Sequence, residues 1–356
     1  MKLFTIGPTQ MYETTIKVRS KQIPYFRTKD FSEMVLKTNS MLKRYINTSN
    51  NSEIIWLTAS GTGGMEATII NCFNKNDKLL VIVGGNFGAR FAEICKIHDI
   101  PYDILSISYG NKLTEDDFTN YYGNGYTGVI VNLHETSTGQ LYDINLIKNF
   151  CKRENAYLIV DAIGTFLCDE FKMDENGIDV AIVSSQKGLC VSPGISLIFL
   201  NNKIIKNKIL TNNVKSLYFD FKNYINNIHR GQTPYTPAVG IVYEIYDMLN
   251  FIENNGGISK HLEIIKKRAQ YFRDLLKKNN LTYPSYPLSN ALTPVIIKKP
   301  LAKEIFKELK DNFDLIVNPV GGENADYVFR VAHIGNLNFY DYNLLIEKIK
   351  NIIGMR

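Results

Sequence analysis

Long hydrophobic runs are absent from this sequence. None of its apolar stretches approaches the roughly 18 residues that a membrane-spanning helix requires, so we expect no association with a membrane. The N-terminal stretch MKLFTIGP also has too short an apolar segment for a secretory signal peptide. These two absences favour a protein that works in the cytoplasm.

Cysteines are few and have no paired or CxxC spacing; the five are Cys72, Cys95, Cys151, Cys168 and Cys190. Scattered cysteines of this kind are typical of reduced thiols in a cytoplasm. They predict neither a disulfide framework nor a zinc site, and we expect no bound metal.

A strong excess of charge of one sign is also missing. The formal net charge is only +6 over 356 residues, and the lysines are interspersed with Asn and Ile without a basic-aromatic stripe. A nucleic-acid partner is therefore disfavoured. The glycine-rich turn at residues 60–64 matches neither a Walker A sequence nor GxGxxG.

Strand and helix patterns alternate through the first two thirds of the chain. Near-continuous apolar strands are predicted at residues 53–59, 78–84, 101–107, 127–133, 156–162, 179–185 and 194–200, with amphipathic helices between several of them. This alternation is typical of an α/β fold with a mostly parallel sheet covered on both faces. Beyond about residue 237, two long helices, short strands at 292–299 and 327–334 and further helices predict a smaller α+β domain.

Polar and glycine residues follow these strands at the edge where such sheets bind ligands. Ser60, Gly61 and Thr62 form a small turn before a helix, which suits a phosphate or a plain tight turn equally well. Phe87 lies among glycines after the next strand, where its ring could cover a flat ligand or simply fill the core. The sequence leaves the roles of His134 and Glu135, which follow a third strand, undecided.

A carboxylate and a lysine end two further strands of the same sheet. Asp161 follows AYLIV and Lys187 follows DVAIVSSQ, and both charges would be costly to bury without a partner. Pyridoxal 5′-phosphate needs this combination: a lysine for a Schiff base, a carboxylate for the pyridine nitrogen and a phosphate site. We therefore expect this cofactor at the strand ends.

The chain resembles the class V aminotransferases of the fold type I pyridoxal-phosphate enzymes. It is most similar to the branch that holds alanine–glyoxylate (serine–pyruvate) and 2-aminoethylphosphonate–pyruvate aminotransferases. The resemblance covers nearly the whole chain and rests on six stretches in order: GPT at 7–9, SGTGGMEA at 60–67, NFGAR at 86–90, HETSTG at 134–139, VDAIG at 160–164, and SSQKGL with PGISLI at 184–198.

The resemblance implies a large domain with a seven-stranded, mostly parallel sheet at residues 16–240. It also implies an N-terminal segment near the active site at 1–15 and a small domain that binds the substrate carboxylate at 241–356. Lys187 would form the internal aldimine and Asp161 would hold the ring nitrogen. The remaining implied cofactor contacts are Ser60, Gly61, Thr62 and Gln186 at the phosphate, Phe87 and Ile163 on the ring faces, and Thr136 at the ring hydroxyl.

The resemblance further implies a homodimer with shared active sites. Thr233 and Thr236 would contact the phosphate bound by the partner subunit. Arg330 would clamp the substrate α-carboxylate, and Gly7 and Pro8 would lie beside the substrate. Two departures from the relatives stand out: Gly63-Gly64 replaces larger residues in the phosphate turn, and Phe87 stands where some relatives have Trp or Tyr.

The function that follows is transfer of an amino group from a small donor such as alanine or serine to pyruvate or glyoxylate, by a ping-pong cycle. A cysteine desulfurase is disfavoured because no cysteine follows Cys190. A lyase, racemase, decarboxylase or inactive cofactor-binding regulator stays open, as does 2-aminoethylphosphonate–pyruvate transfer. A phosphonate donor would need a further cation, for which Arg19, Arg27 and Arg90 are candidates.

Overall fold

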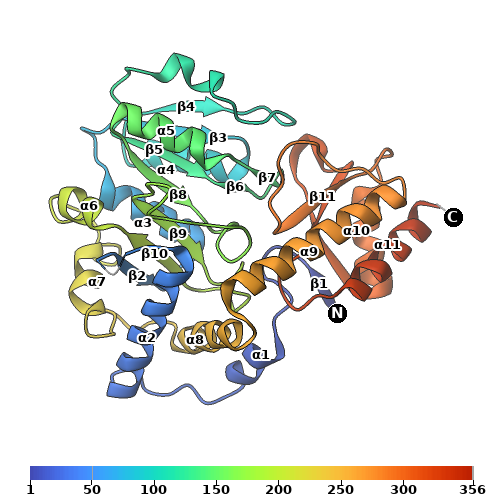
Figure 1. Cartoon of the computed structure of the whole chain (residues 1–356), viewed down its shortest axis with the longest axis horizontal. Helices are drawn as coiled ribbons and strands as arrows, with labels where there is room; N and C mark the ends of the chain where they lie inside the picture. Colours follow the sequence, from blue (N-terminus) through green and yellow to red (C-terminus); the bar gives the residue numbers. More distant parts are fainter. Residues whose placement is uncertain (50, 355–356) are drawn as a thin grey trace.

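The computed structural model of the chain describes residues 1–49 and 51–354, and its central feature is a seven-stranded sheet (Figure 1). The strand order is β2-β10-β9-β8-β5-β3-β4, and only β10 runs against its neighbours. The predicted mostly parallel α/β sheet is therefore confirmed. The strands are β2 (Glu53–Leu57), β3 (Leu79–Val83), β4 (Tyr102–Ser106), β5 (Gly128–Asn132), β8 (Tyr157–Asp161), β9 (Val180–Ser184) and β10 (Ser196–Leu200).

Helices cover both faces of this sheet, which explains why its strands are apolar at nearly every position. In β3, Leu79 and Val81 join the core on one face, while Leu80 and Ile82 join the core on the other. One face packs against α3 (Gly61–Cys72), α4 (Asn86–Ile97) and α7 (Phe221–Ile228). The other face packs against α2 (Lys29–Ile46), α5 (Ile144–Glu154) and α8 (Val239–Asn254).

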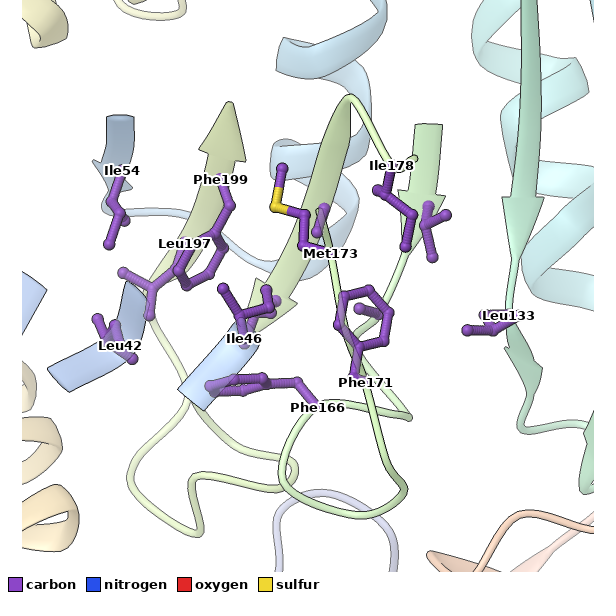
Figure 2. Close-up of a cluster of buried hydrophobic side chains, with 14 of the residues drawn as sticks. Leu42, Ile46, Ile54, Leu133, Phe166, Phe171, Met173, Ile178, Leu197 and Phe199 are labelled. Carbon is purple, nitrogen blue, oxygen red and sulfur yellow. The ribbon is translucent and has the colours of Figure 1, made fainter. Parts of the chain in front are cut away.

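Figure 2 shows part of the core on the face of the sheet that packs against α2, α5 and α8. Leu42 and Ile46 from α2 belong with Leu197 and Phe199 from β10 to one cluster, which also contains buried residues of the segment 166–178. The same cluster contains Val183, Leu189 and Val191, which flank Lys187 along the chain, so its packing anchors both ends of the turn that carries the lysine.

A second, four-stranded sheet has the order β1-β12-β13-β11. Its first strand comes from the N-terminus and pairs in parallel with β12, so that Lys2 faces Leu315. Strands β11 and β13 were predicted from the sequence, whereas β1 and β12 were not. The elements of this unit are β1 (Lys2–Phe4), β11 (Leu292–Ile296), β12 (Leu315–Pro319), β13 (Val328–Ala332), α9 (Gly257–Lys278), α10 (Ala302–Phe313) and α11 (Phe339–Ile353).

The division at residue 240 stays a prediction. Helix α8 spans this boundary, and its apolar side packs in the core of the large sheet. Short elements complete the connections: α1 (Glu13–Arg19), β6 (His134–Glu135), β7 (Gln140–Leu141) and α6 (Asn202–Ile204). Within residues 1–49 and 51–354, no helix is both long and apolar enough to cross a membrane.

The core beneath the site can be tested at Phe199, which is fully buried. Phe199→Ala should lower the free energy of unfolding by about 3–5 kcal/mol, because the lost side chain leaves a cavity against Phe166. Urea unfolding of the cofactor-free protein measures this. The matched control is Phe313→Ala, where the ring is 37% exposed and the loss should stay below about 1 kcal/mol. Equal losses in the two variants would contradict the packing described.

Candidate active site

The ends of several strands of the large sheet surround one cavity of about 140 Å³. Every residue predicted to contact the cofactor from within its own subunit lines it, together with four residues that were not predicted for this role. The lining residues are Ser60, Gly61, Thr62, Met65, Phe87, Arg90, Asn132, Thr136, Asp161, Ile163, Gly164, Gln186 and Lys187.

The turn at the start of α3 has the geometry expected for an anion site. Ser60 is the N-cap of the helix, and its Oγ accepts a hydrogen bond from the Gly63 N–H at 3.3 Å. Gly61 lies so close to Ile163 that an added Cβ would be 2.5 Å from Cδ1. The backbone N–H groups and the positive end of the helix dipole are therefore held at the cavity wall without a side chain in front of them.

Asp161 is a buried carboxylate at the end of β8, with 1% of its surface exposed. Burial raises its pKa to about 6, although hydrogen bonds from the Ile163 N–H at 2.8 Å and Asn132 Nδ2 at 2.7 Å favour the charged form. Its carboxylate forms no ion pair with another described residue. A cation in the cavity would compensate this charge.

Lys187 stands in the turn after β9 and is half-buried. Burial and, next, the positive charge of Arg330 lower its pKa to about 8. The N-terminal segment packs directly on this lysine, since a Cβ on Gly7 would lie 2.7 Å from its Cδ. Pro8 is exposed, and its carbonyl accepts a hydrogen bond from the Thr5 hydroxyl. The structure thus places Gly7 against Lys187, and the position of Pro8 beside the substrate stays a prediction.

Arg330 lies on β13 of the small sheet and borders a second cavity, of about 340 Å³, which it shares with Phe87 and Arg90. Its Nη1 donates to the Thr136 carbonyl and its Nη2 to the Pro319 carbonyl, both at 2.6 Å. These partners are neutral, so the guanidinium keeps its charge for an anion.

The structure gives His134 and Glu135 supporting positions. Glu135 accepts hydrogen bonds from the Gly88 and Ser137 N–H groups, each at 3.1 Å, which ties β6 to the start of α4 beside Phe87. His134 Nδ1 donates to the Gly164 carbonyl at 2.8 Å, and burial lowers the pKa of the ring to about 3. A neutral His134 therefore stabilises the turn after Asp161 through its hydrogen bond to Gly164.

Thr233 and Thr236 lie away from this cavity in the single chain. The Thr233 hydroxyl donates to the Tyr235 carbonyl at 2.7 Å, while Thr236 is exposed beside a groove between the α1 region and α8. Their contact with a partner's phosphate stays a prediction. Three arginines were candidate cations for a phosphonate. Arg90 lines both the Lys187 cavity and the Arg330 cavity. Arg19 is exposed at the groove beside α8, and Arg27 donates a hydrogen bond to the Thr233 carbonyl at 2.9 Å.

Asn132 was not singled out from the sequence, and Arg90 was named only as a candidate cation for a phosphonate, yet both line the cofactor cavity. Asn132 is the last residue of β5 and so obeys the same strand-end rule that pointed to Asp161. Arg90 is three residues after Phe87 on α4, and helical spacing places such residues on one face. Gly164 and Met65 also line the cavity, but no pattern in the sequence distinguishes them from structural residues.

The sequence profile of the family described as "Aminotransferase class-V" matches residues 10–299. The chain belongs to this family. It is 29% identical to the soluble hydrogenase small subunit of Synechococcus sp. over 98% of this chain and 91% of that protein. It is 25% identical to the L-aspartate–glyoxylate aminotransferase of Paracoccus denitrificans over 94% of this chain and 86% of that protein. The solved alanine–glyoxylate aminotransferase of Nostoc sp. superposes with a TM-score of 0.92 at 22% identity, over 99% and 94% of the two chains.

Family membership implies pyridoxal 5′-phosphate as the cofactor, and the cavity fits it. An amine with a lowered pKa, an uncompensated buried carboxylate and the N-terminus of α3 all face one space. The Asn132 Oδ1 is also buried without a hydrogen-bond partner among the described residues. These groups suit a ligand with a carbonyl carbon, a protonated ring nitrogen and a phosphate.

The lowered pKa of Lys187 can be tested by its pH dependence. Only the neutral amine attacks a carbonyl carbon, so cofactor uptake by the cofactor-free protein should speed up as the pH rises through about 8. Arg330→Met removes a positive charge that lowers this pKa, and the midpoint should therefore move to higher pH. Stopped-flow absorbance measures the rate. Arg330→Lys is the matched control, because it keeps the charge; an unshifted midpoint in Arg330→Met would contradict the assigned cause.

Proposed function

We propose that this aminotransferase moves an amino group from a small donor, such as alanine or serine, to pyruvate or glyoxylate in a ping-pong cycle. The observation that carries the proposal is the cavity that unites Lys187, Asp161 and the start of α3, with Arg330 lining a second cavity that shares Phe87 and Arg90 with the first. The bound cofactor supplies a carbonyl group that takes up the amino group and a ring that withdraws electrons from the substrate Cα.

Most side chains of the cavity have a role in this proposal. The Asp161 carboxylate would keep the ring nitrogen protonated, and that ion pair would offset the cost of burying the carboxylate. Phe87 and Ile163 would cover the ring, and Thr136 would contact its hydroxyl side. Backbone and side-chain donors of Ser60, Gly61, Thr62 and Gln186 would hold the phosphate.

Lys187 would hold the cofactor through its Nζ between turnovers. With a donor amine bound, the Nζ would carry a proton to and from the substrate Cα. A pKa of about 8 suits this work, because both protonation states are populated near neutral pH. Because Gly7 has no side chain, the N-terminal segment can pack closely against the methylene groups of Lys187.

Arg330 binds the substrate α-carboxylate, with the Thr136 and Pro319 carbonyls holding the guanidinium in place. A planar fork of donors gives a carboxylate one orientation, which aligns Cα with Lys187. The relatives named aspartate–glyoxylate and serine–glyoxylate aminotransferase support a small amino acid and glyoxylate as the pair. A 2-aminoethylphosphonate donor or a lyase reaction is the alternative.

We also infer a cytoplasmic homodimer with shared active sites. The five cysteines are buried and free, which supports a reducing compartment. Thr233 and Thr236 lie outside their own chain's cavity, which is what contact with a partner's phosphate requires.

A half-reaction screen tests the donor class. Single amino donors are added to the cofactor-loaded protein without an oxo acid, and the visible absorbance and the released cofactor form are followed. Alanine or serine should convert the cofactor to pyridoxamine phosphate. Release of ammonia or carbon dioxide without pyridoxamine phosphate would instead identify a lyase or a decarboxylase.

The attachment residue is tested by borohydride reduction followed by mass spectrometry. Wild-type protein should carry the reduced cofactor on the peptide that contains Lys187. Lys187→Ala should carry none, whereas Lys203→Ala, which removes an exposed lysine beyond β10, should label like wild type. Labelling that survives in Lys187→Ala would reject the assignment.

Shared active sites predict complementation between two inactive variants. Thr236→Glu places a carboxylate where the partner's phosphate is expected, and Lys187→Ala removes the attachment site. In a hybrid dimer, isolated by two different tags, one site regains all its native groups. The hybrid should therefore show about half the activity of the wild-type dimer. Activity no higher than that of either parent would exclude sharing through Thr236.

A further inference from the structure

The cavity at Lys187 contains few positive charges for a ligand that carries a phosphate. Among the described residues that line it, only Lys187 and Arg90 have cationic side chains. Lys187 would hold the cofactor carbonyl carbon through its neutral amine, so its ammonium charge would not serve the phosphate. The other groups expected at the phosphate, from residues 60–62 and Gln186, are neutral. Arg90 is then the cation that remains in the cavity.

Arg90 extends from α4 to the start of α3, where the phosphate is expected. Its Nη1 donates to Thr62 Oγ1 at 3.0 Å, and its guanidinium carbon lies 5.2 Å from the centre of the Phe87 ring. No carboxylate of the described chain forms an ion pair with it. A half-buried guanidinium without an acidic partner is suited to bind an anion.

The direction of the hydrogen bond between Arg90 and Thr62 also orients the Thr62 hydroxyl. An arginine side chain can only donate, so Thr62 Oγ1 accepts from Arg90. The hydroxyl hydrogen of Thr62 is then free to be donated to another acceptor. Because Thr62 lies in the first turn of α3 and lines the cavity, a phosphate oxygen at this turn would be that acceptor.

We propose that Arg90 is the charge partner of the cofactor phosphate within its own subunit, and that it orients the Thr62 hydroxyl toward that phosphate. This inference rests on the proposed function. Arg90 also borders the cavity of Arg330, so a distal anionic group of the substrate is the competing ligand. Thr62 favours the phosphate, because it belongs to the α3 turn and is absent from the lining of the Arg330 cavity.

The test compares two cofactor forms that differ only in the phosphate. Cofactor-free protein is titrated with pyridoxal phosphate and with pyridoxal, and each affinity is read from the visible absorbance. Arg90→Gln should weaken binding of pyridoxal phosphate about tenfold or more, since a hydrogen bond to a charged group is lost. Its affinity for pyridoxal should change less than about twofold. Arg90→Lys keeps the charge and should restore part of the loss.

Lys96→Gln is the matched control, because it removes an exposed positive charge from the same helix and lines neither cavity. It should leave both affinities unchanged. Equal weakening of pyridoxal and pyridoxal phosphate in Arg90→Gln would overturn the proposal and assign Arg90 to support of the Phe87 ring. Unchanged cofactor affinity with a raised KM for donors that carry a second anionic group would assign it to the substrate. A wild-type protein that binds neither form would contradict the proposed function itself.

Discussion

A buried carboxylate, Asp161, and a half-buried amine, Lys187, follow neighbouring strands at one end of the large sheet. Asp161 ends β8 and Lys187 follows β9, and these strands are direct neighbours. Burial pushes both groups toward their neutral forms, with the pKa of Asp161 raised to about 6 and that of Lys187 lowered to about 8. A ligand that is cationic on the side of Asp161 and reacts with the amine of Lys187 relieves both costs. The cofactor implied by the family has these two properties.

The turns around these charges leave almost no choice of residue. A Cβ on Gly188 would lie 2.0 Å from the Phe166 carbonyl oxygen, so the chain can leave Lys187 only through a glycine. At Gly61 the neighbour is instead the end of the Ile163 side chain, 2.5 Å from an added Cβ. Because the neighbour at Gly188 is backbone, the turn that follows Lys187 is held in position before any ligand binds. Such preorganisation lowers the cost of binding.

The two sheets are joined at the site itself. Arg330 belongs to the small sheet, and its guanidinium donates to the Thr136 carbonyl of the large unit and to the Pro319 carbonyl of its own. Nearby, Asp169 accepts hydrogen bonds from the Asn290 N–H and side chain, at 2.9 and 2.8 Å. The residue proposed to clamp the substrate carboxylate is thus also a link between the units. A substrate bound by Arg330 would therefore act directly on a contact between the two units.

The sequence predicts best what depends on local pattern. Strands such as β5, β8 and β9 could be recognised because both faces are buried, and the strand-end rule then led to Asp161 and Lys187. Strand β1 could not be predicted, since three residues carry no periodicity and the strand forms only by pairing with β12. The two backbone carbonyl groups that Arg330 binds could not be predicted either, because every residue has such a group. The roles of Thr233 and Thr236 depend on a second chain.

The different ligands proposed for Arg90 and Arg330 also bear on which substrates the site accepts. Both border one cavity, so a donor with two anionic groups could in principle use both. If the cofactor phosphate engages Arg90, the charge left for the substrate is that of Arg330 alone, which suits one carboxylate and a small neutral side chain. The hydrogen bond from Arg90 to Thr62 already turns the guanidinium toward the α3 turn. The same contact that would strengthen cofactor binding would therefore favour alanine- or serine-like donors over dicarboxylic or phosphonate donors.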